Sequence, residues 1–294
     1  MGSLGSVLAV ALGVTVWGTG RAAQNGFVLR DDLQREVSFA RPPQRLISLL
    51  PSLTETVCAL DACDRLVATD RFSNWPEAVK ALPKVGGLDD ASLEAIVAFK
   101  PDLILLSHSQ RIIGRLDGLG LRSFAVNTQT LADIDRTVQI VGRILGVPDR
   151  AQALTSRIDH AVRDIGAEAL AHRAAPGPTV YYEEDPAPYA AGPESFIGEL
   201  LSRLGARNIV TRDLGPYPKL NPEYVVQHDP DVIFISPSES LRLKERPGWD
   251  TIRAVKERRL CSFTPAVRDT IVRAGPRVAE GMRALRECLE RVAP

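Results

Sequence analysis

Apolar residues along this chain follow two patterns, short continuous runs and longer stretches with helical spacing. The longest helical stretch is Pro148–Arg173, in which apolar residues recur every three or four positions. Its only proline comes first, where a helix tolerates it, and at about 1.5 Å per residue it would form a rod of roughly 39 Å. Because this segment lies near the middle of the chain, we expect it to connect two lobes.

The chain before this segment alternates between apolar runs and helical stretches. Ser52-Leu53-Thr54-Glu55 has the form of a capping box and predicts a helix that ends near Leu60. A short hairpin is expected within Phe27–Arg45. The predicted strands are Leu46–Leu50, Leu66–Thr69, Leu103–Leu106 and Phe124–Val126, and further helices are predicted from Ser92, over Gly114–Gly120 and over Leu131–Leu145.

The same alternation resumes after the long segment. Short apolar strands separated by helices are typical of parallel sheets covered on both faces. The predicted strands are Thr179–Tyr182, Asn208–Val210, Val232–Ile235 and Leu260–Phe263, and the predicted helices are Phe196–Leu204, a helix opened by Asn221 and Pro222, Trp249–Lys256 and Gly275–Val292.

One stretch of the first half is repeated in the second. Ser92–Ser107 (SLEAIVAFKPDLILLS) matches Asn221–Ser236 (NPEYVVQHDPDVIFIS) position for position, as a cap residue, a glutamate, a helix, a proline stop and a buried strand. We therefore predict an α/β fold of two Rossmann-like lobes with parallel sheets, joined by one long α-helix, with a ligand cleft between the lobes. A single larger sheet is the alternative.

The predicted boundaries place the N-terminal lobe at 24–147, the connecting helix at 148–174 and the C-terminal lobe at 175–294. Residues 1–23 are predicted to be a signal peptide, because Leu4–Trp17 is an apolar run of about 14 residues, too short to span a bilayer comfortably. Export to the periplasm is therefore expected. No Lys or Arg precedes the run, so a buried N-terminal helix is the alternative. No Cys follows it, so a lipid anchor is not indicated.

Composition excludes some classes of partner. The 294 residues carry a formal net charge of zero and no long basic run, so nucleic-acid binding is not expected. None of the four cysteines, Cys58, Cys63, Cys261 and Cys288, belongs to a CxxC pair, which argues against a zinc knuckle. Disulfides and buried free thiols both stay open, because the pairing cannot be read from the sequence.

The familiar catalytic and nucleotide-binding motifs are missing, among them the phosphate-binding loop, GxGxxG after a strand, GxSxG and HExxH. No pair of carboxylates has a catalytic spacing, so neither an enzyme nor a metal site is expected. His108 directly follows the strand Leu103–Leu106 and Ser107, at the carboxyl end where open parallel sheets bind ligands. An ordinary loop histidine is the alternative.

Four stretches resemble one family: Arg45–Glu55 (RLISLLPSLTE), Phe72–Glu77 (FSNWPE), Leu82–Gly87 (LPKVGG) and Ser92–Leu103 (SLEAIVAFKPDL). They are similar to the helical-backbone (class III) periplasmic substrate-binding proteins of ABC importers, which serve cobalamin, haem and ferric siderophores. The resemblance extends from about Phe27 to the C-terminus. It implies two lobes bridged by a rigid helix, little closure on binding, and delivery of the ligand to a dimeric permease in the inner membrane.

The cobalamin-binding branch looks most similar, because Phe72–Pro76 resembles its aromatic binding loop. The resemblance implies a corrinoid or related metal chelate as the cargo of a monomeric protein, with no cofactor of its own. The implied pocket residues are Phe72, Trp75, Leu88, Tyr189, Tyr217, Asp269 and Arg273. In the alternative, a haem or ferric-siderophore binder, His108, Tyr189 or Tyr217 would be the axial ligand of a haem.

Glu94 and Glu223 are the matched glutamates of the repeat, one in each predicted lobe. By themselves they are acids in the first turn of a helix, which the helix dipole favours. The resemblance implies that they dock to arginines of the permease, and two like lobes would present two like charges to a two-fold partner. A two-lobed α/β enzyme is the alternative from another class of protein.

Overall fold

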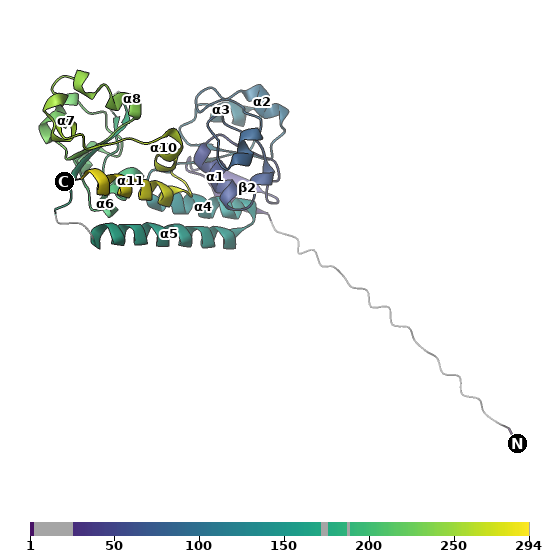
Figure 1. Cartoon of the computed structure of the whole chain (residues 1–294). Helices are drawn as coiled ribbons and strands as arrows, with labels where there is room; N and C mark the ends of the chain where they lie inside the picture. Colours follow the sequence, from purple (N-terminus) through teal and green to yellow (C-terminus); the bar gives the residue numbers. More distant parts are fainter. Residues whose placement is uncertain (3–25, 172–175, 187–188, 294) are drawn as a thin grey trace.

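The computed structural model describes residues 1–2, 26–171, 176–186 and 189–293. Two lobes lie side by side along the long helix α5 (Pro148–Ala171), which runs beneath both of them in Figure 1. The expected two-lobed α/β architecture is confirmed, and the single larger sheet is excluded because the parallel strands form two separate sheets. The predicted signal peptide lies outside the described residues, apart from Met1 and Gly2, and so do the last residues predicted for the long helix.

The N-terminal lobe contains a four-stranded parallel sheet in the order β4-β3-β5-β6. A separate antiparallel hairpin, β1 and β2, precedes it, as predicted. The elements are β1 (Phe27–Arg30), β2 (Glu36–Phe39), β3 (Leu46–Ser48), α1 (Pro51–Ala59), η1 (Cys63–Arg65), β4 (Leu66–Thr69), η2 (Glu77–Ala81), α2 (Leu93–Ala98), β5 (Leu103–Ser107), α3 (Ile113–Gly118), β6 (Ser123–Val126) and α4 (Leu131–Leu145).

The C-terminal lobe contains the parallel strands β9, β7, β10 and β11 in that order, with β8 antiparallel to β7. Its strands are β7 (Thr179–Asp185), β8 (Tyr189–Ala190), β9 (Arg207–Asn208), β10 (Val232–Phe234) and β11 (Leu260–Cys261). Its helices are α6 (Phe196–Arg203), η3 (Arg212–Leu214), α7 (Pro222–His228), α8 (Pro237–Ser240), η4 (Leu243–Glu245), η5 (Trp249–Thr251), α9 (Arg253–Lys256), α10 (Pro265–Val272) and α11 (Val278–Val292).

The parallel strands of the two lobes follow the same order. In each sheet the first strand lies between the second and the third, with the fourth at the edge. The repeated sequence stretch forms α2 and β5 in one lobe and α7 and β10 in the other. Both helices begin with a side-chain cap, since Ser92 Oγ accepts from Ala95 N and Asn221 Oδ1 accepts from Glu223 N. The internal repeat is therefore structural as well as sequential.

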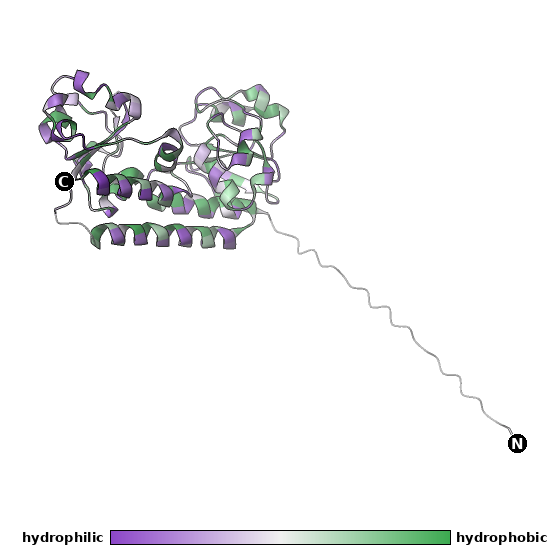
Figure 2. Ribbon diagram, in the orientation of Figure 1, coloured by the Kyte–Doolittle hydropathy of each residue, from purple (hydrophilic) through white to green (hydrophobic). Residues whose placement is uncertain are grey.

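Helix α5 joins the cores of the two lobes. Ala151 and Leu154 near its start belong to the N-terminal core, whereas Val162 and Ile165 belong to the C-terminal core. Ile158, between them, packs against both. Apolar and polar positions alternate along this helix in Figure 2, as expected for a helix with one buried face.

Some predicted boundaries are wrong for identifiable reasons. Helix α1 starts at Pro51, whose fixed φ suits the first helical position, and Leu50 rather than Ser52 precedes it without a side-chain cap. The predicted helix Trp249–Lys256 is two short helices, because Ile252 is extended. The terminal helix starts at Val278 instead of Gly275, and α10 was not predicted.

The cysteines form two disulfides, which settles the alternative left open by the sequence. Cys58 pairs with Cys63, and Cys261 pairs with Cys288. Each bond lies within one lobe: the first joins α1 to η1, and the second joins β11 to α11. The disulfides therefore cross-link each lobe internally and do not connect the two lobes.

Gly142 lets α4 and α5 approach closely, because a Cβ at this position would overlap the Cβ of Ala151. We predict that Gly142→Ala lowers the free energy of unfolding by about 1–3 kcal/mol, measured by urea denaturation. Gly114→Ala is the matched control, since Gly114 lies exposed in α3 with no atom within 4 Å of an added Cβ. That control should be neutral or stabilising by up to about 1 kcal/mol. Equal stability of both variants would contradict the tight packing of α4 on α5.

Candidate functional site at the interface of the two lobes

Residues of both lobes meet around the guanidinium of Arg273, which follows α10. Its Nη1 donates to Glu55 Oε1 in α1 (2.7 Å) and to Asn74 Oδ1 (2.9 Å). Its Nη2 donates to Asp269 Oδ2 (2.7 Å) and to the carbonyl oxygen of Phe72 (3.1 Å). The side chain of Arg273 is 10% exposed and that of Glu55 only 1%, so this is a largely buried tie between the lobes.

The chain segments that meet around Arg273 both follow the carboxyl end of a strand. The loop with Phe72 and Asn74 follows β4, and the segment with Asp269 and Arg273 follows β11. Both strands are parallel members of their sheets, so both segments start at carboxyl ends, where open α/β sheets bind ligands. Two of the predicted pocket residues, Asp269 and Arg273, are thereby brought from the C-terminal lobe to the aromatic loop of the N-terminal lobe.

Phe72, Trp75 and Leu88 contribute apolar surface on the N-terminal side. Phe72 is 52% exposed and Leu88 38% exposed. Their loops are neighbours, because a Cβ on Gly87 would lie 3.2 Å from the Phe72 ring. Trp75 is half-buried, and the guanidinium carbon of Arg277 lies 4.5 Å from its ring centroid. Phe72 and Leu88 are thus the members of this group with the most free surface for an apolar ligand.

Asp70 holds this aromatic loop in shape. Its Oδ1 accepts hydrogen bonds from the backbone N–H groups of Phe72 (2.7 Å) and Ser73 (3.1 Å). Lys84 Nζ donates to the carbonyl oxygen of Ser73 at 2.7 Å. Burial raises the pKa of the Asp70 carboxyl, whereas these hydrogen bonds lower it. The exposed ring of Phe72 is therefore presented by a loop with an internal network of polar contacts.

Tyr189 and Tyr217 lie together on the C-terminal lobe. The backbone N–H of Ala190, next to Tyr189, donates to Pro218 O, next to Tyr217 (3.0 Å). Tyr189 is 41% exposed, whereas Tyr217 is half-buried against the core of its lobe. Burial and the nearby Glu184 carboxylate raise the pKa of Tyr217, so it is a neutral hydroxyl at physiological pH. Tyr189 is the more accessible of the two to a ligand.

His108 lies at the carboxyl end of β5, as predicted. Strand β3 separates β5 from β4, the strand that leads into the aromatic loop. Its backbone N–H donates to Val126 O at 2.8 Å. Its Nδ1 is buried and has no hydrogen-bond partner among the described residues. The His108 side chain is half-buried, and it belongs to a different part of the N-terminal sheet from Phe72.

Sequence reasoning missed Glu184, near the carboxyl end of β7. Its Oε2 is buried without a hydrogen-bond partner in the described part of the chain, and Arg268 Nη2 lies 4.0 Å from its Oε1. Burial raises the pKa of this carboxyl, and Arg268 lowers it by less. The available signal was the run Glu183–Asp185 at the end of an apolar strand. Arg268 also lines a small pocket at the strand ends with Tyr182, Phe234, Ser236 and Phe263.

Glu94 and Glu223 are both exposed, in α2 and α7 respectively. Figure 1 shows α2 and α7 in different lobes, on the side of the molecule away from α5. The repeated stretches therefore present two like carboxylates from equivalent helices. Within the described ranges, no group of three or more His, Cys, Asp or Glu side chains could hold a metal ion, and no helix is long and apolar enough to cross a membrane.

The fold and the residues at the lobe interface define a two-lobed α/β protein whose lobes are bridged by one helix. The chain belongs to the periplasmic binding protein family, whose model matches residues 46–267. The chain is 28% identical to an uncharacterized ABC transporter substrate-binding lipoprotein of Bacillus subtilis (strain 168) over 88% of this chain and 84% of that protein.

Two further similarities concern proteins with named ligands. A cobalamin-binding protein of Halobacterium salinarum is 31% identical to this chain. The matched region covers 67% of this chain and 55% of that relative. The crystal structure of a periplasmic haem-binding protein from Pseudomonas aeruginosa superposes with a TM-score of 0.74 at 28% identity, over 86% of this chain and 94% of that one. The predicted family is thereby confirmed.

The buried carboxyl of Glu184 predicts a specific pH dependence. The pKa of Glu184 is higher in the folded than in the unfolded protein, so the folded protein binds more protons between these two pKa values. The free energy of unfolding therefore falls as the pH rises through this range. Glu184→Gln should therefore raise the melting temperature relative to wild type at pH 8, and the difference should disappear at pH 4. Glu287→Gln, exposed on α11, controls for the loss of one negative charge. A pH-independent difference for Glu184→Gln would contradict this assignment.

Proposed function

We propose that the protein is a periplasmic substrate-binding protein that captures cobalamin or a related corrinoid between its lobes and delivers it to an ABC importer permease. The observation that carries the proposal is the exposed Phe72, whose loop neighbours the loop of the exposed Leu88 and lies next to the polar group of Asp269 and Arg273. Apolar side chains suit a flat macrocycle, and the Asp269 carboxylate, which Arg273 holds in place, suits amide groups at its rim. The named ligand of the Halobacterium relative supports this choice.

In this proposal the protein binds its ligand and does not convert it. The exposed aromatic and aliphatic side chains offer contact area, and Arg273 already has four acceptors, which keeps it in place rather than free to move. Tyr189 would cover the cargo from the C-terminal lobe. The importer role also agrees with the substrate-binding proteins of ABC transporters among its relatives. Export through the predicted signal peptide, residues 1–23, belongs to this proposal.

Haem is the second candidate, favoured by His108. Its side chain is half-buried directly after the carboxyl end of β5, and an imidazole is a usual axial ligand of haem iron. The haem-binding protein of Pseudomonas aeruginosa adds support. Titration calorimetry of the mature protein with cobalamin, cobinamide and haemin distinguishes the candidates. Haemin binding that His108→Ala abolishes, together with no binding of cobalamin or cobinamide, would replace the corrinoid proposal.

We predict that cobalamin binds with a dissociation constant of micromolar order or tighter and that Phe72→Ala weakens this binding by about tenfold, through the loss of aromatic contact area. Leu119→Ala is the matched control, because Leu119 is 55% exposed in the same lobe and lies after α3, outside the candidate site. The control variant should bind cobalamin as wild type does. Equal affinities of the Phe72 and Leu119 variants would remove Phe72 from the cargo site.

Glu94 and Glu223 are proposed to dock to arginines of the permease dimer, since both are exposed and equivalent in the repeat. We predict that Glu94→Ala/Glu223→Ala reduces cobalamin uptake strongly in cells that carry the cognate permease, while the calorimetric affinity for cobalamin stays unchanged. Glu287→Ala is the control for an exposed carboxylate elsewhere. Normal uptake by the double variant would contradict the docking role.

A further inference from the structure

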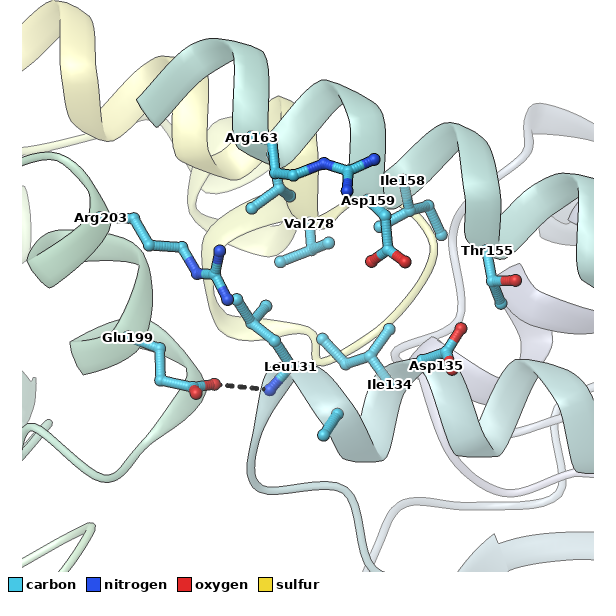
Figure 3. A pocket seen from close by; sticks show the side chains of 12 residues that line it. Leu131, Ile134, Asp135, Thr155, Ile158, Asp159, Arg163, Glu199, Arg203 and Val278 are labelled. Atoms are coloured by element: carbon cyan, nitrogen blue, oxygen red, sulfur yellow. Dashed lines mark hydrogen bonds between the residues drawn. The ribbon is translucent and has the colours of Figure 1, made fainter. Parts of the chain in front are cut away.

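A cavity of about 370 Å³ lies between α4, α5 and α6, with the first residue of α11 at its wall (Figure 3). It shares no residue with the candidate cargo site. The volume is more than twice the roughly 150 Å³ of a cavity that holds benzene, and it falls within the usual range of ligand pockets. Its apolar wall consists of Leu131, Ala132, Ile134, Ile158, Val162 and Val278.

The rim of this cavity carries two cations and two anions without partners. They are Arg163 and Asp159 from α5, Arg203 from α6 and Asp135 from α4. None of the four side chains makes a hydrogen bond or ion pair with another residue in the described ranges, although Asp159 and Arg163 are four positions apart on one helix, a spacing that allows an ion pair. Figure 3 shows Arg203 and Asp159 directed toward the space from different helices.

Glu199, a fifth charged residue of the lining, is already engaged. Its Oε2 accepts from the backbone N–H of Leu131 at 2.7 Å, the contact drawn in Figure 3. This bond joins α6 of the C-terminal lobe to the start of α4 of the N-terminal lobe. The cavity thus lies against a contact between lobes, and Ile158 in its wall packs on the cores of both.

We propose that this cavity is a second small-molecule site and that it takes a small zwitterion with an apolar body, as a free apolar amino acid has. The apolar body covers the apolar wall, its carboxylate pairs with the arginines, and its ammonium pairs with the aspartates. A ligand with the same apolar body but only one charged group would leave either the two arginines or the two aspartates of the rim without a partner. The site is separate from the one proposed for the cargo, and its occupant contacts both lobes and the connecting helix.

The test uses three ligands with the same phenyl body: L-phenylalanine, 3-phenylpropionate and 2-phenylethylamine. Each is titrated calorimetrically into the mature protein at low ionic strength. We expect L-phenylalanine to bind with a dissociation constant of millimolar order or tighter, and each singly charged analogue to bind about tenfold more weakly, because one charge-assisted contact is lost. No binding of L-phenylalanine, or equal binding of an analogue, would overturn the proposal.

Two variants locate the binding. Arg203→Met and Asp159→Asn should each weaken L-phenylalanine binding by about tenfold, since each removes one charge from the rim. Arg157→Met is the matched control, because Arg157 is exposed on α5 and is not part of the cavity lining. Circular dichroism confirms that each variant is folded. L-phenylalanine binding that neither rim variant weakens would assign it to another place and overturn the proposal for this cavity.

Discussion

The arrangement of the two lobes depends on a matched pair of glutamates. Glu55 in α1 accepts a hydrogen bond from Arg273 of the other lobe, and Glu199 in α6 accepts one from the backbone of Leu131 of the other lobe. The two glutamates occupy equivalent places, because each lies in the helix after the first parallel strand of its sheet. Each meets the opposite lobe near the start of its last helix, since Leu131 is the first residue of α4 and Arg273 lies shortly before α11. The lobe contacts therefore repeat with the same internal symmetry as the sheets.

The two contacts differ in their electrostatics. Burial raises the pKa of the Glu55 carboxyl, and Arg273 opposes this rise. One carboxylate oxygen of Glu55 pairs with Arg273, while the other is buried without a hydrogen-bond partner in the part of the chain that is described. A buried ion pair of this kind contributes little net stability, but removing one partner leaves an uncompensated charge. Its effect here is to fix where the C-terminal lobe lies against the aromatic loop.

Much of the fold could be predicted, because it follows from local patterns. The repeat of Ser92–Ser107 in Asn221–Ser236 identifies two equivalent lobes, and the boundaries of α4 match the prediction because Thr130 and Gly146 cap both of its ends. The role of Glu55 could not be predicted in the same way. Its spacing from Ser52 fits a capping box, whereas its partner Arg273 is 218 positions away. Contacts between lobes leave no periodic signal in the sequence.

In the candidate site, too, some features follow from local sequence patterns and others only from tertiary packing. The aromatic loop was recognisable from Phe72–Pro76, but the neighbourhood of Phe72 and Leu88 depends on the packing of Gly87 against the Phe72 ring. Glu184 has no motif at all, and its unusual environment results from burial at a strand end. Residues that lie next to each other only through tertiary packing have to be read from the structure.

The lobes are attached to each other on more than one side, which limits how they can move. Helix α5 runs along both cores, while the contacts of Arg273 tie the carboxyl ends of the two sheets. A hinge motion about α5 would separate Arg273 from Glu55 and would also break the hydrogen bonds of Arg273 to Asn74 and to the carbonyl oxygen of Phe72. A shear of the lobes would break the Glu199–Leu131 contact. The two attachments therefore favour lobes that keep the same relative position, so that the proposed cargo site would be largely preformed.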